Sequence, residues 1–437
     1  MNHLLSYLRF GAPAALATVV FGATIPAQAA VSDALEERLR QLEAEVQELK
    51  NPQSPVITAD GRGLTVSSHD GAYGFRLRAA LQADGRFFLE DESPSTDTFL
   101  LRRLRPTFQG HLGELVSFRL TADLDESSAS IIDAYIDVHL ASALTLRGGF
   151  VKGPVGLERL QSAANLAFNE RAFPTELVPN REIGLQLQGD LLAERLSWVL
   201  GVYNGAADGR SDGANPDDQF EIAGRLFAHP FAGSGGVLDG FGLGVAASHG
   251  KKKGGGNALL PRYRSAGQET VFQYNGGTSA DGDFVRISPQ GYWYAGSFGV
   301  LAEYIISRQQ VINAPDWEAL SHHAWAVSGS WVLTGEKPGY GGVRPASEFG
   351  PGGDGWGAFE LVARAQGLEI DRDAFPIFAS RDERVSGAVA WGLGLNWWLT
   401  RNLKAQLNYV QTRFDDGAVS GDREDERVLF TRLQLAF

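Results

Sequence analysis

The residues of this sequence that are best suited to bind a ligand are its arginines. Arginine supplies 32 of the 39 basic side chains, and lysine supplies seven. A guanidinium group binds phosphate or a carboxylate through two parallel hydrogen bonds and stays charged at any relevant pH. One arginine about 5 Å from a unit negative charge contributes ~3 kcal/mol at an effective dielectric of about 20, so two or three could offset partial dehydration of an anion.

Many of these arginines share one side of segments in which polar and apolar residues alternate. The arginines on that side are Arg76, Arg78, Arg86, Arg103, Arg105, Arg119, Arg147, Arg225, Arg286, Arg364 and Arg432. A further three cations, Lys152, Arg159 and Arg171, lie in a polar connection over residues 152–180. Its 29 residues far exceed an ordinary hairpin loop, and connections of that length usually carry function. In a wide barrel such a loop can fold inward and narrow the channel.

Acidic residues occupy the same side of these segments and leave the charge preference open. They are Asp84, Asp123, Asp125, Asp133, Asp137, Glu182, Asp190, Glu221 and Glu360, and the whole chain carries a net charge of −13. Channels without selectivity are also lined by mixed charge, so the charge pattern alone favours an anion path only slightly. An acidic chain is a poor partner for nucleic acid. Other acids lie in loops, where divalent ions can bridge them to lipopolysaccharide.

Enzymatic and metal sites are disfavoured by the composition. The chain has no cysteine, which excludes thiolate metal sites and cysteine nucleophiles. No zinc-protease, EF-hand or phosphate-binding loop pattern occurs, and we expect neither cofactor nor metal. A hydrolase at the lipid interface would need a serine–histidine pair. The best match is Ser321 beside His322 and His323, but consecutive residues of a strand point to opposite faces. We therefore expect no enzyme activity.

The alternating segments predict the elements that position these residues. Each is about 10 residues long, which is what a tilted strand needs to cross a bilayer. We count sixteen, near 73–89, 99–112, 115–126, 130–140, 143–151, 181–191, 195–204, 218–228, 240–250, 283–294, 297–308, 321–334, 355–367, 385–399, 402–414 and 427–437. A shorter strand-like piece at 269–274 fits a hairpin inside a loop.

The connections between these segments alternate between tight turns and long loops. Tight turns fall at 113–114, 141–142, 192–194, 295–296 and 400–401, and long polar loops at 90–98, 152–180, 204–217, 251–282 and 415–426. Outer-membrane barrels have short turns at one end and long loops at the other. Residues 335–354 break the rule, because this Gly- and Pro-rich connection is long but falls on the short-turn side.

A closed barrel in a membrane explains the alternation better than a soluble sandwich does. A sandwich of sixteen strands would need a helix layer to fill its core, and helical patterning is absent after residue 52. Backbone groups in lipid must all be paired, which a closed barrel achieves. The predicted fold class is all-β: a 16-stranded antiparallel transmembrane β-barrel over residues 53–437, with its apolar face in lipid and its charged face around a water-filled lumen.

The first 52 residues are predicted to form a secretory signal peptide followed by a short helix. An apolar run over 10–25, followed by Ala27-Gln28-Ala29, predicts a signal peptide over residues 1–29 rather than an uncleaved anchor. Residues 30–52 carry Leu35, Leu39, Leu42, Val46 and Leu49 at the 4–3 spacing of a coiled-coil seam. The coil is under three heptads, so it needs another contact to hold the chains together. The alternative is a solvated amphipathic helix.

Several motifs resemble the phosphate-selective porin O/P family, from about residue 56 to the C-terminus. They are Leu101-Arg102-Arg103, Leu146-Arg147, Lys152-Gly153-Pro154, Leu157-Glu158-Arg159-Leu160, Glu170-Arg171, the run 177–184, Leu333-Thr334-Gly335-Glu336, the run 357–364 and Leu395-Asn396-Trp397. The resemblance implies a homotrimer of sixteen-stranded subunits with an inward-folded third loop. It implies that Lys152, Arg159 and Arg171 lie at or near the constriction. It also places Arg102 and Arg103 on a cationic ladder, to which we assign Arg105 and Arg147 as well.

The combined interpretation is a homotrimeric outer-membrane porin that passes small anions passively, with phosphate as the expected solute. One alternative is a general porin, or a porin of the same fold selective for organic anions or small solutes. A second alternative is a structural barrel whose coil tethers the cell wall.

Overall fold

The computed structural model describes residues 25–49, 54–89, 95–124, 129–256, 259–352 and 355–437. The chain divides into two units, Met1–Ser54 and Pro55–Phe437. The first unit contains helix α1 (Ile25–Leu49). No helix in the described ranges is both long enough and apolar enough to cross a membrane. The predicted signal peptide falls largely on residues 1–24, outside the described residues, and stays a prediction.

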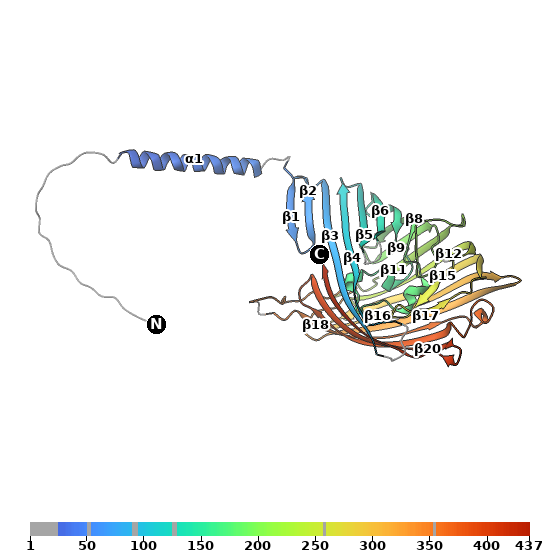
Figure 1. Cartoon of the computed structure of the whole chain (residues 1–437). Helices are drawn as coiled ribbons and strands as arrows, with labels where there is room; N and C mark the ends of the chain where they lie inside the picture. The colour runs from blue at the N-terminus through green and yellow to red at the C-terminus, as the bar shows by residue number, and fades with distance from the viewer. Residues whose placement is uncertain (1–24, 50–53, 90–94, 125–128, 257–258, 353–354) are drawn as a thin grey trace, which may run out of the picture. The chain divides into compact units, whose positions relative to one another are not determined.

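The second unit is a closed barrel of sixteen strands within the described residues (Figure 1). These strands are β3 (Tyr73–Phe88), β4 (Thr98–Leu112), β5 (Val116–Leu124), β6 (Ala129–Ala141), β7 (Leu144–Val151), β8 (Arg181–Leu191), β9 (Leu196–Tyr203), β11 (Glu221–Ala228), β12 (Phe241–Gly255), β15 (Ser279–Ala295), β16 (Phe298–Asn313), β17 (Asp316–Val332), β18 (Ala358–Glu369), β19 (Val385–Trp398), β20 (Leu403–Ala418) and β22 (Glu426–Ala436). All sixteen match a predicted segment to within a few residues, so the predicted fold class is confirmed.

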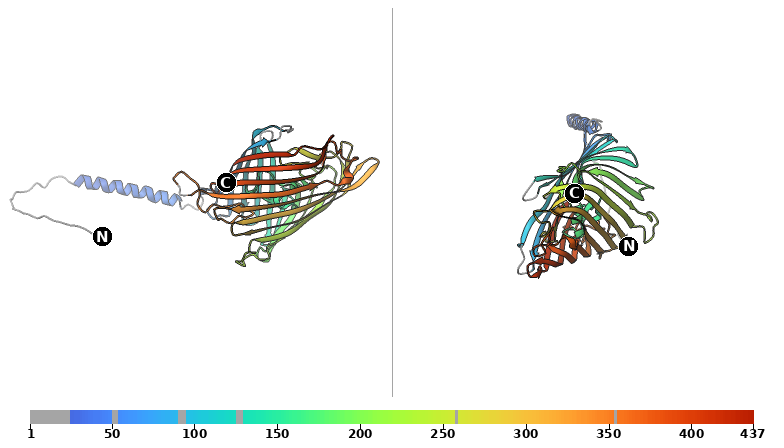
Figure 2. Two further views of the ribbon diagram at one scale, coloured as in Figure 1. Left: turned by 90° about the horizontal axis from the view of Figure 1, so that it is seen from below. Right: turned by 90° about the vertical axis from the view of Figure 1, so that its right-hand side faces the viewer.

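The barrel closes because its last strand pairs with its first. Each strand is antiparallel to the next along the chain, and β22 pairs with β3 from Val428↔Phe88 to Ala436↔Ala80. Figure 2 shows the resulting tilted, closed wall from two further directions. Closure leaves no unpaired sheet edge in lipid, which is the condition for strands to span a membrane.

Side chains alternate between the two faces of the wall as period two requires. On β19 the outward residues Val389, Trp391 and Leu393 are 57%, 45% and 56% exposed, whereas Asn396 on the inner side is fully buried. One inward side chain contradicts the simple alternation. Ile132 falls on the apolar side of the alternating segment 130–140, but it is buried and borders the lumen. A β-bulge on β6 shifts the register there, between Thr121 and Ala122 of the partner strand.

Small strands and helices supplement the wall. The hairpin of β1 (Val56–Asp60) and β2 (Gly63–Ser67) extends the sheet beside the start of β3, and the sequence pattern did not predict it. The remaining short elements are β10 (Ser211–Asp212), β13 (Arg262–Arg264), β14 (Thr270–Gln273), β21 (Gly421–Asp422), α2 (Leu157–Leu160), η1 (Ala163–Asn165), η2 (Phe173–Leu177) and η3 (Arg372–Ala374). The β13–β14 pair is the hairpin expected near 269–274.

The lumen is not lined by charged residues alone, as the sequence pattern suggested. An apolar core fills part of it, where Phe168, Phe173 and Leu177 of the 152–180 loop pack with inward residues such as Ile305 and Leu320. The physical reason is that inward-folded loops bring their own apolar side chains, which need apolar partners on the wall. The apolar cluster therefore occupies one side of the lumen, and the cavity described below lies mainly against strands β3 to β9 and β11.

Candidate functional site

The open space inside the barrel is a cavity of about 720 Å³. Its wall side comes from β3 to β9 and β11, and its other side comes from the loop over residues 152–180, which we call the constriction loop. All seven predicted site residues line it: Lys152, Arg159, Arg171, Arg102, Arg103, Arg105 and Arg147. The structure thus brings the predicted constriction residues and the predicted ladder residues to one cavity.

Two consecutive arginines, Arg102 and Arg103, both reach this cavity, which a regular strand would not allow. The register of β4 against β3 shifts here, because Gln82 pairs with Arg103 while Ala83 pairs with Leu101. Arg102 is the extra residue of a β-bulge, and the bulge redirects its side chain to the inner face. Strand alternation predicted only Arg103 on this face, whereas Arg102 was assigned through the family resemblance.

Three of the four ladder arginines are paired with carboxylates. Arg102 donates from Nε and Nη2 to Glu170 at 2.6 and 3.0 Å. Arg147 makes the same bidentate contact from Nε and Nη2 to Asp137, at 2.6 and 2.8 Å. Arg105 Nη2 donates to Asp123 Oδ2 at 2.6 Å. Burial alone would raise the pKa of Glu170, but the Arg102 cation outweighs it and holds that pKa well below its usual range. These pairs reduce the net positive charge that the three arginines present to the cavity.

Arg103 is the ladder arginine whose side chain contacts an amide instead of a carboxylate. Its Nη1 donates to Gln82 Oε1 at 2.6 Å, and the side chain is only 4% exposed. Within the described residues, the Nε–H groups of Arg103, Arg105 and Arg159 have no acceptor. A buried donor without an acceptor costs about 1–3 kcal/mol, so these groups can be satisfied by water or by an anion that enters the cavity.

The three predicted constriction cations also hold their own loop. Lys152 Nζ lies 2.7 Å from Arg159 O and 3.2 Å from Gln161 O. Arg171 donates to Glu158 O at 3.1 Å and to Gln161 O at 2.8 Å. Arg159 donates to Asn180 Oδ1 at 3.0 Å and to Thr175 O. Carbonyl partners leave the positive charges uncompensated, so these residues can attract an anion while they shape the loop.

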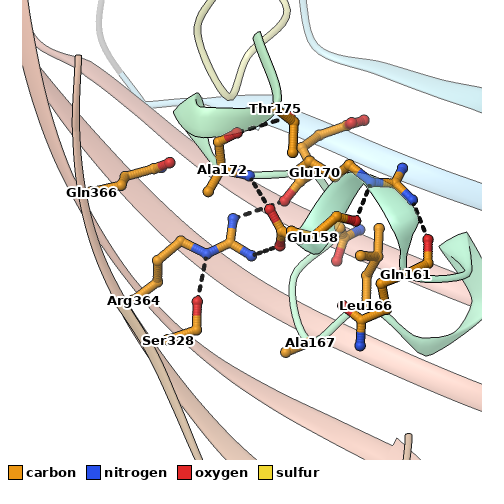
Figure 3. Close-up of polar contacts among 12 residues, drawn as sticks. Glu158, Gln161, Leu166, Ala167, Glu170, Ala172, Thr175, Ser328, Arg364 and Gln366 are labelled. Atoms are coloured by element: carbon orange, nitrogen blue, oxygen red, sulfur yellow. Dashed lines mark hydrogen bonds and ion pairs between the residues drawn. The ribbon is translucent and has the colours of Figure 1, made fainter. Parts of the chain in front are cut away.

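The constriction loop is fixed to the wall by buried polar contacts (Figure 3). Arg364 Nη2 of β18 lies 2.7 Å from Glu158 Oε1, and both side chains are about 5% exposed or less. Glu158 Oε2 also accepts from Ala172 N at 2.6 Å. On another side Lys404 Nζ donates to Ala164 O and Leu166 O at 3.1 and 3.0 Å. The backbone of the loop is thus bound from several strands.

Further cations that line the cavity received no site role from the sequence. Arg181 begins β8 and pairs with Asp133 at 2.9 Å. Arg210, Arg262 and Arg264 lie in the loops that follow β9 and β12. A period-two pattern cannot place loop residues, so no sequence signal located these three. The described residues that line the cavity include thirteen arginines and one lysine but only four acidic side chains, Asp123, Asp133, Glu170 and Glu176.

The histidine pair has the arrangement expected for a strand and forms no catalytic site. His322 is buried in the lumen, where its ring nitrogen lies 2.8 Å from Tyr274 Oη. His323 lies on the outer face, 2.8 Å from Tyr304 Oη. Among the described residues, no group of three or more His, Asp or Glu side chains is arranged to hold a metal ion.

Comparison with known proteins places this geometry among porins. A family model described as phosphate-selective porin O and P matches residues 75–437, beginning later than the predicted residue 56. Porin O of Pseudomonas aeruginosa is 25% identical over 417 residues, covering 87% of this chain and 92% of that protein.

Solved structures with little sequence identity share the fold. The outer membrane channel DcaP of Acinetobacter baumannii has a TM-score of 0.56 at 9% identity, covering 84% of this chain and 98% of that one. OmpT of Vibrio cholerae, expressed in the outer membrane, has a TM-score of 0.54 at 10% identity, with the same two coverages.

Proposed function

We propose that this member of the phosphate-selective porin O and P family conducts small anions and prefers phosphate. As a member of that family it is an outer-membrane porin and a channel without enzymatic activity. The proposal concerns the finer property, which is the charge and identity of the solute. Lys152, Arg159 and Arg171 are proposed as the constriction, and Arg102, Arg103, Arg105 and Arg147 as the ladder.

The observation that carries the proposal is the charge balance of the cavity. Fourteen cationic side chains face four acidic side chains there, although the whole chain is acidic. Low-dielectric walls concentrate the field of these cations in the cavity, which raises the local concentration of anions. Cations lose part of their hydration shell on entry and are also repelled by the positive field, so the cavity opposes their passage.

The arrangement of contacts supports passage rather than tight binding. Arg103 offers a free Nε–H among the described residues, whereas the charges of Arg102, Arg105 and Arg147 are shared with carboxylates. A row of moderate sites lets an ion enter and also lets it leave. Phosphate suits such a row, since it accepts several guanidinium hydrogen bonds at once.

We also propose a homotrimer with an outer wall that is only partly in lipid. Tryptophan is enriched where barrels meet the membrane–water interface. All nine tryptophans of the chain lie between residues 198 and 398, so strands β3 to β8 carry none. A wall that packs on neighbouring subunits has no need of interfacial tryptophan. In α1 the seam residues Leu35 and Leu39 are 69% and 56% exposed, as a helix that pairs with other copies requires.

Planar-bilayer recordings of the purified protein test the selectivity. In a KCl gradient we expect a reversal potential whose sign indicates selectivity for chloride over potassium. We also expect the chloride current to decrease with increasing phosphate concentration. Arg103→Gln should weaken the phosphate block, while Arg401→Gln on the exposed 400–402 turn serves as the matched control. A reversal potential of the sign for potassium would refute the anion proposal.

A general porin is the second candidate, and one observation favours it. Arg102, Arg105, Arg147 and Arg181 each have a carboxylate within 3.0 Å, which lowers the net field along the wall. The same recordings decide between the candidates, because a general porin gives a reversal potential near zero and no block by phosphate.

A further inference from the structure

The long connection on the short-turn side of the barrel contacts the constriction loop. It joins β17 to β18 between Val332 and Ala358, and it is the connection that broke the alternation of short and long loops. Its residue Tyr340 lies inside the barrel, where Tyr340 Oη donates to Leu157 O at 2.6 Å. Gln161 Nε2 of the constriction loop donates to Tyr340 O at 2.9 Å. The two loops, which start from opposite ends of the barrel, are therefore joined by two hydrogen bonds.

These two hydrogen bonds involve Leu157 and Gln161, which lie in the same turn whose carbonyls bind the predicted constriction cations. The carbonyl of Gln161 accepts from both Lys152 Nζ and Arg171 Nη2, at 3.2 and 2.8 Å. Leu157 begins α2, and Glu303 of β16 accepts the Leu157 N–H at 2.6 Å. The first carbonyl of α2 is thus held by Tyr340 and the first amide by Glu303. Tyr340 is thus one of the groups that hold the turn whose carbonyls contact Lys152 and Arg171.

The connection between β17 and β18 is itself anchored to the barrel wall, so its position can affect the constriction loop. Inside, Val343 packs with Trp398, and the Tyr340 ring stacks on Tyr292 with 5.5 Å between ring centroids. Gly342 has φ +86°, and a Cβ there would approach Trp398 to 2.7 Å, so only glycine fits. The far end of the same connection lies on the outer face, where Trp397 Nε1 donates to Trp356 O at 2.7 Å.

This far end carries exposed aromatic side chains at the short-turn end of the barrel. Phe349 packs edge-on against Trp397 with 5.2 Å between centroids, and Trp356 is 70% exposed. Such residues settle at the membrane–water interface. The connection therefore reaches from the aromatic contact of Phe349 on the outer face to the constriction loop at Tyr340.

We infer that Tyr340 is a positioning residue, and that residues 333–352 fix the height and width of the constriction from the short-turn side. The inference rests on the proposed function for its link to anion preference. Its effect on the pore itself is separate, because a displaced constriction loop changes the current carried by any salt.

Single-channel recording in symmetric KCl tests the inference with three variants. Tyr340→Phe removes only the hydroxyl bond to Leu157 O, and the loss of one such bond is expected to raise the undocked fraction about fivefold. Gly342→Ala strains the connection without changing Tyr340. The control is Tyr304→Phe, which removes a hydroxyl bond on the outer face. Each variant is first checked for the heat-sensitive electrophoretic mobility of a folded barrel.

We expect Tyr340→Phe and Gly342→Ala to increase open-channel current noise and alter unitary conductance, while Tyr304→Phe matches the wild type. Wild-type noise and conductance in Tyr340→Phe would overturn the inference, whether or not Gly342→Ala folds. A wild-type channel without anion preference would refute the proposed function instead, and the KCl result for Tyr340 would remain valid.

Discussion

At the scale of the residue, the lumen arginines differ in what they offer to a solute. Arg102, Arg105 and Arg147 share their charge with carboxylates, whereas Arg103 is held by the neutral amide of Gln82. An anion gains most from a cation whose charge is not already compensated. We therefore regard Arg103 as the ladder residue with the largest influence on anion passage.

The β-bulge makes a prediction that can be tested chemically, because the chain has no cysteine of its own. Both Arg102→Cys and Arg103→Cys should react rapidly with a water-soluble methanethiosulfonate reagent. Leu104→Cys, which pairs with the outward Leu81, should react slowly or not at all. The rates are followed by the loss of current. Slow reaction of Arg102→Cys together with fast reaction of Arg103→Cys would mean that β4 is regular.

Lys152 gives a prediction for the pH dependence. Burial, reinforced by the nearby Arg171 cation, lowers the pKa of Lys152 well below its ordinary value of 10.5. The charged form is lost as the pH rises through this lowered pKa, so anion preference should fall at a pH below 10.5. Lys152→Arg should keep its preference over the same range, since arginine stays protonated. Reversal potentials at stepped pH measure this, and identical curves for both proteins would contradict it.

Strand alternation is sufficient to place some of these residues and not others. It put Arg103, Arg105 and Arg147 on the inner face, and their contacts confirm that side. It could not place Arg102, because a bulge depends on the local register between two strands rather than on residue type. Neither could it show that Lys152 and Arg171 bind carbonyls of their own loop, since those partners are backbone atoms that leave no mark in the sequence.

At the scale of the element, the constriction loop depends on a few buried polar contacts. Its inward position was expected from its length and from the family resemblance. Its apolar side, with Phe168 and Phe173 packed against the wall, was not expected. Inward wall residues such as Ile305 and Leu320 look like lipid-facing residues in the sequence, because only the loop that covers them distinguishes the two environments.

The ion pair between Glu158 and Arg364 is the contact whose loss should free this loop. In Glu158→Gln the buried Arg364 loses its anionic partner and keeps only the neutral acceptors Ser328 Oγ and Glu170 O, and breaking a buried ion pair in this way costs about 3–5 kcal/mol. We expect larger current noise and faster proteolysis within residues 152–180. Glu383→Gln is the matched control, because its carboxylate pairs with Arg384 at the surface and contributes little. Wild-type behaviour of Glu158→Gln would show that other contacts suffice to hold the loop.

At the scale of the whole molecule, the barrel and the N-terminal helix belong to two separate units. Sixteen strands, their order and their approximate bounds followed from alternation and turn spacing, because lipid on one face and closure by β22 and β3 leave few other solutions. The extra hairpin of β1 and β2 did not follow, since five-residue strands without a strong alternation resemble loops.

The short coil makes a prediction about assembly. Fewer than three heptads provide little association energy by themselves, so in the proposed trimer contacts between the barrel walls supply most of it. Deleting residues 30–52 from the mature protein should leave both the oligomer and its unitary conductance unchanged. Cross-linking in detergent, followed by bilayer recording, measures both. Monomers after the deletion would show instead that the coil holds the subunits together.

The carboxylate-paired arginines also limit how the preference of this channel can change. Arg105–Asp123, Arg147–Asp137 and Arg432–Asp84 each join two neighbouring strands, so each guanidinium contributes to the strength of the wall as well as to its charge. Replacing one of these arginines by an acid would set two negative groups against each other and weaken the junction. A compensating change of the partner acid to a base would restore the junction but leave the net charge of the pair at zero, so these paired positions resist conversion of the wall to a cation pathway.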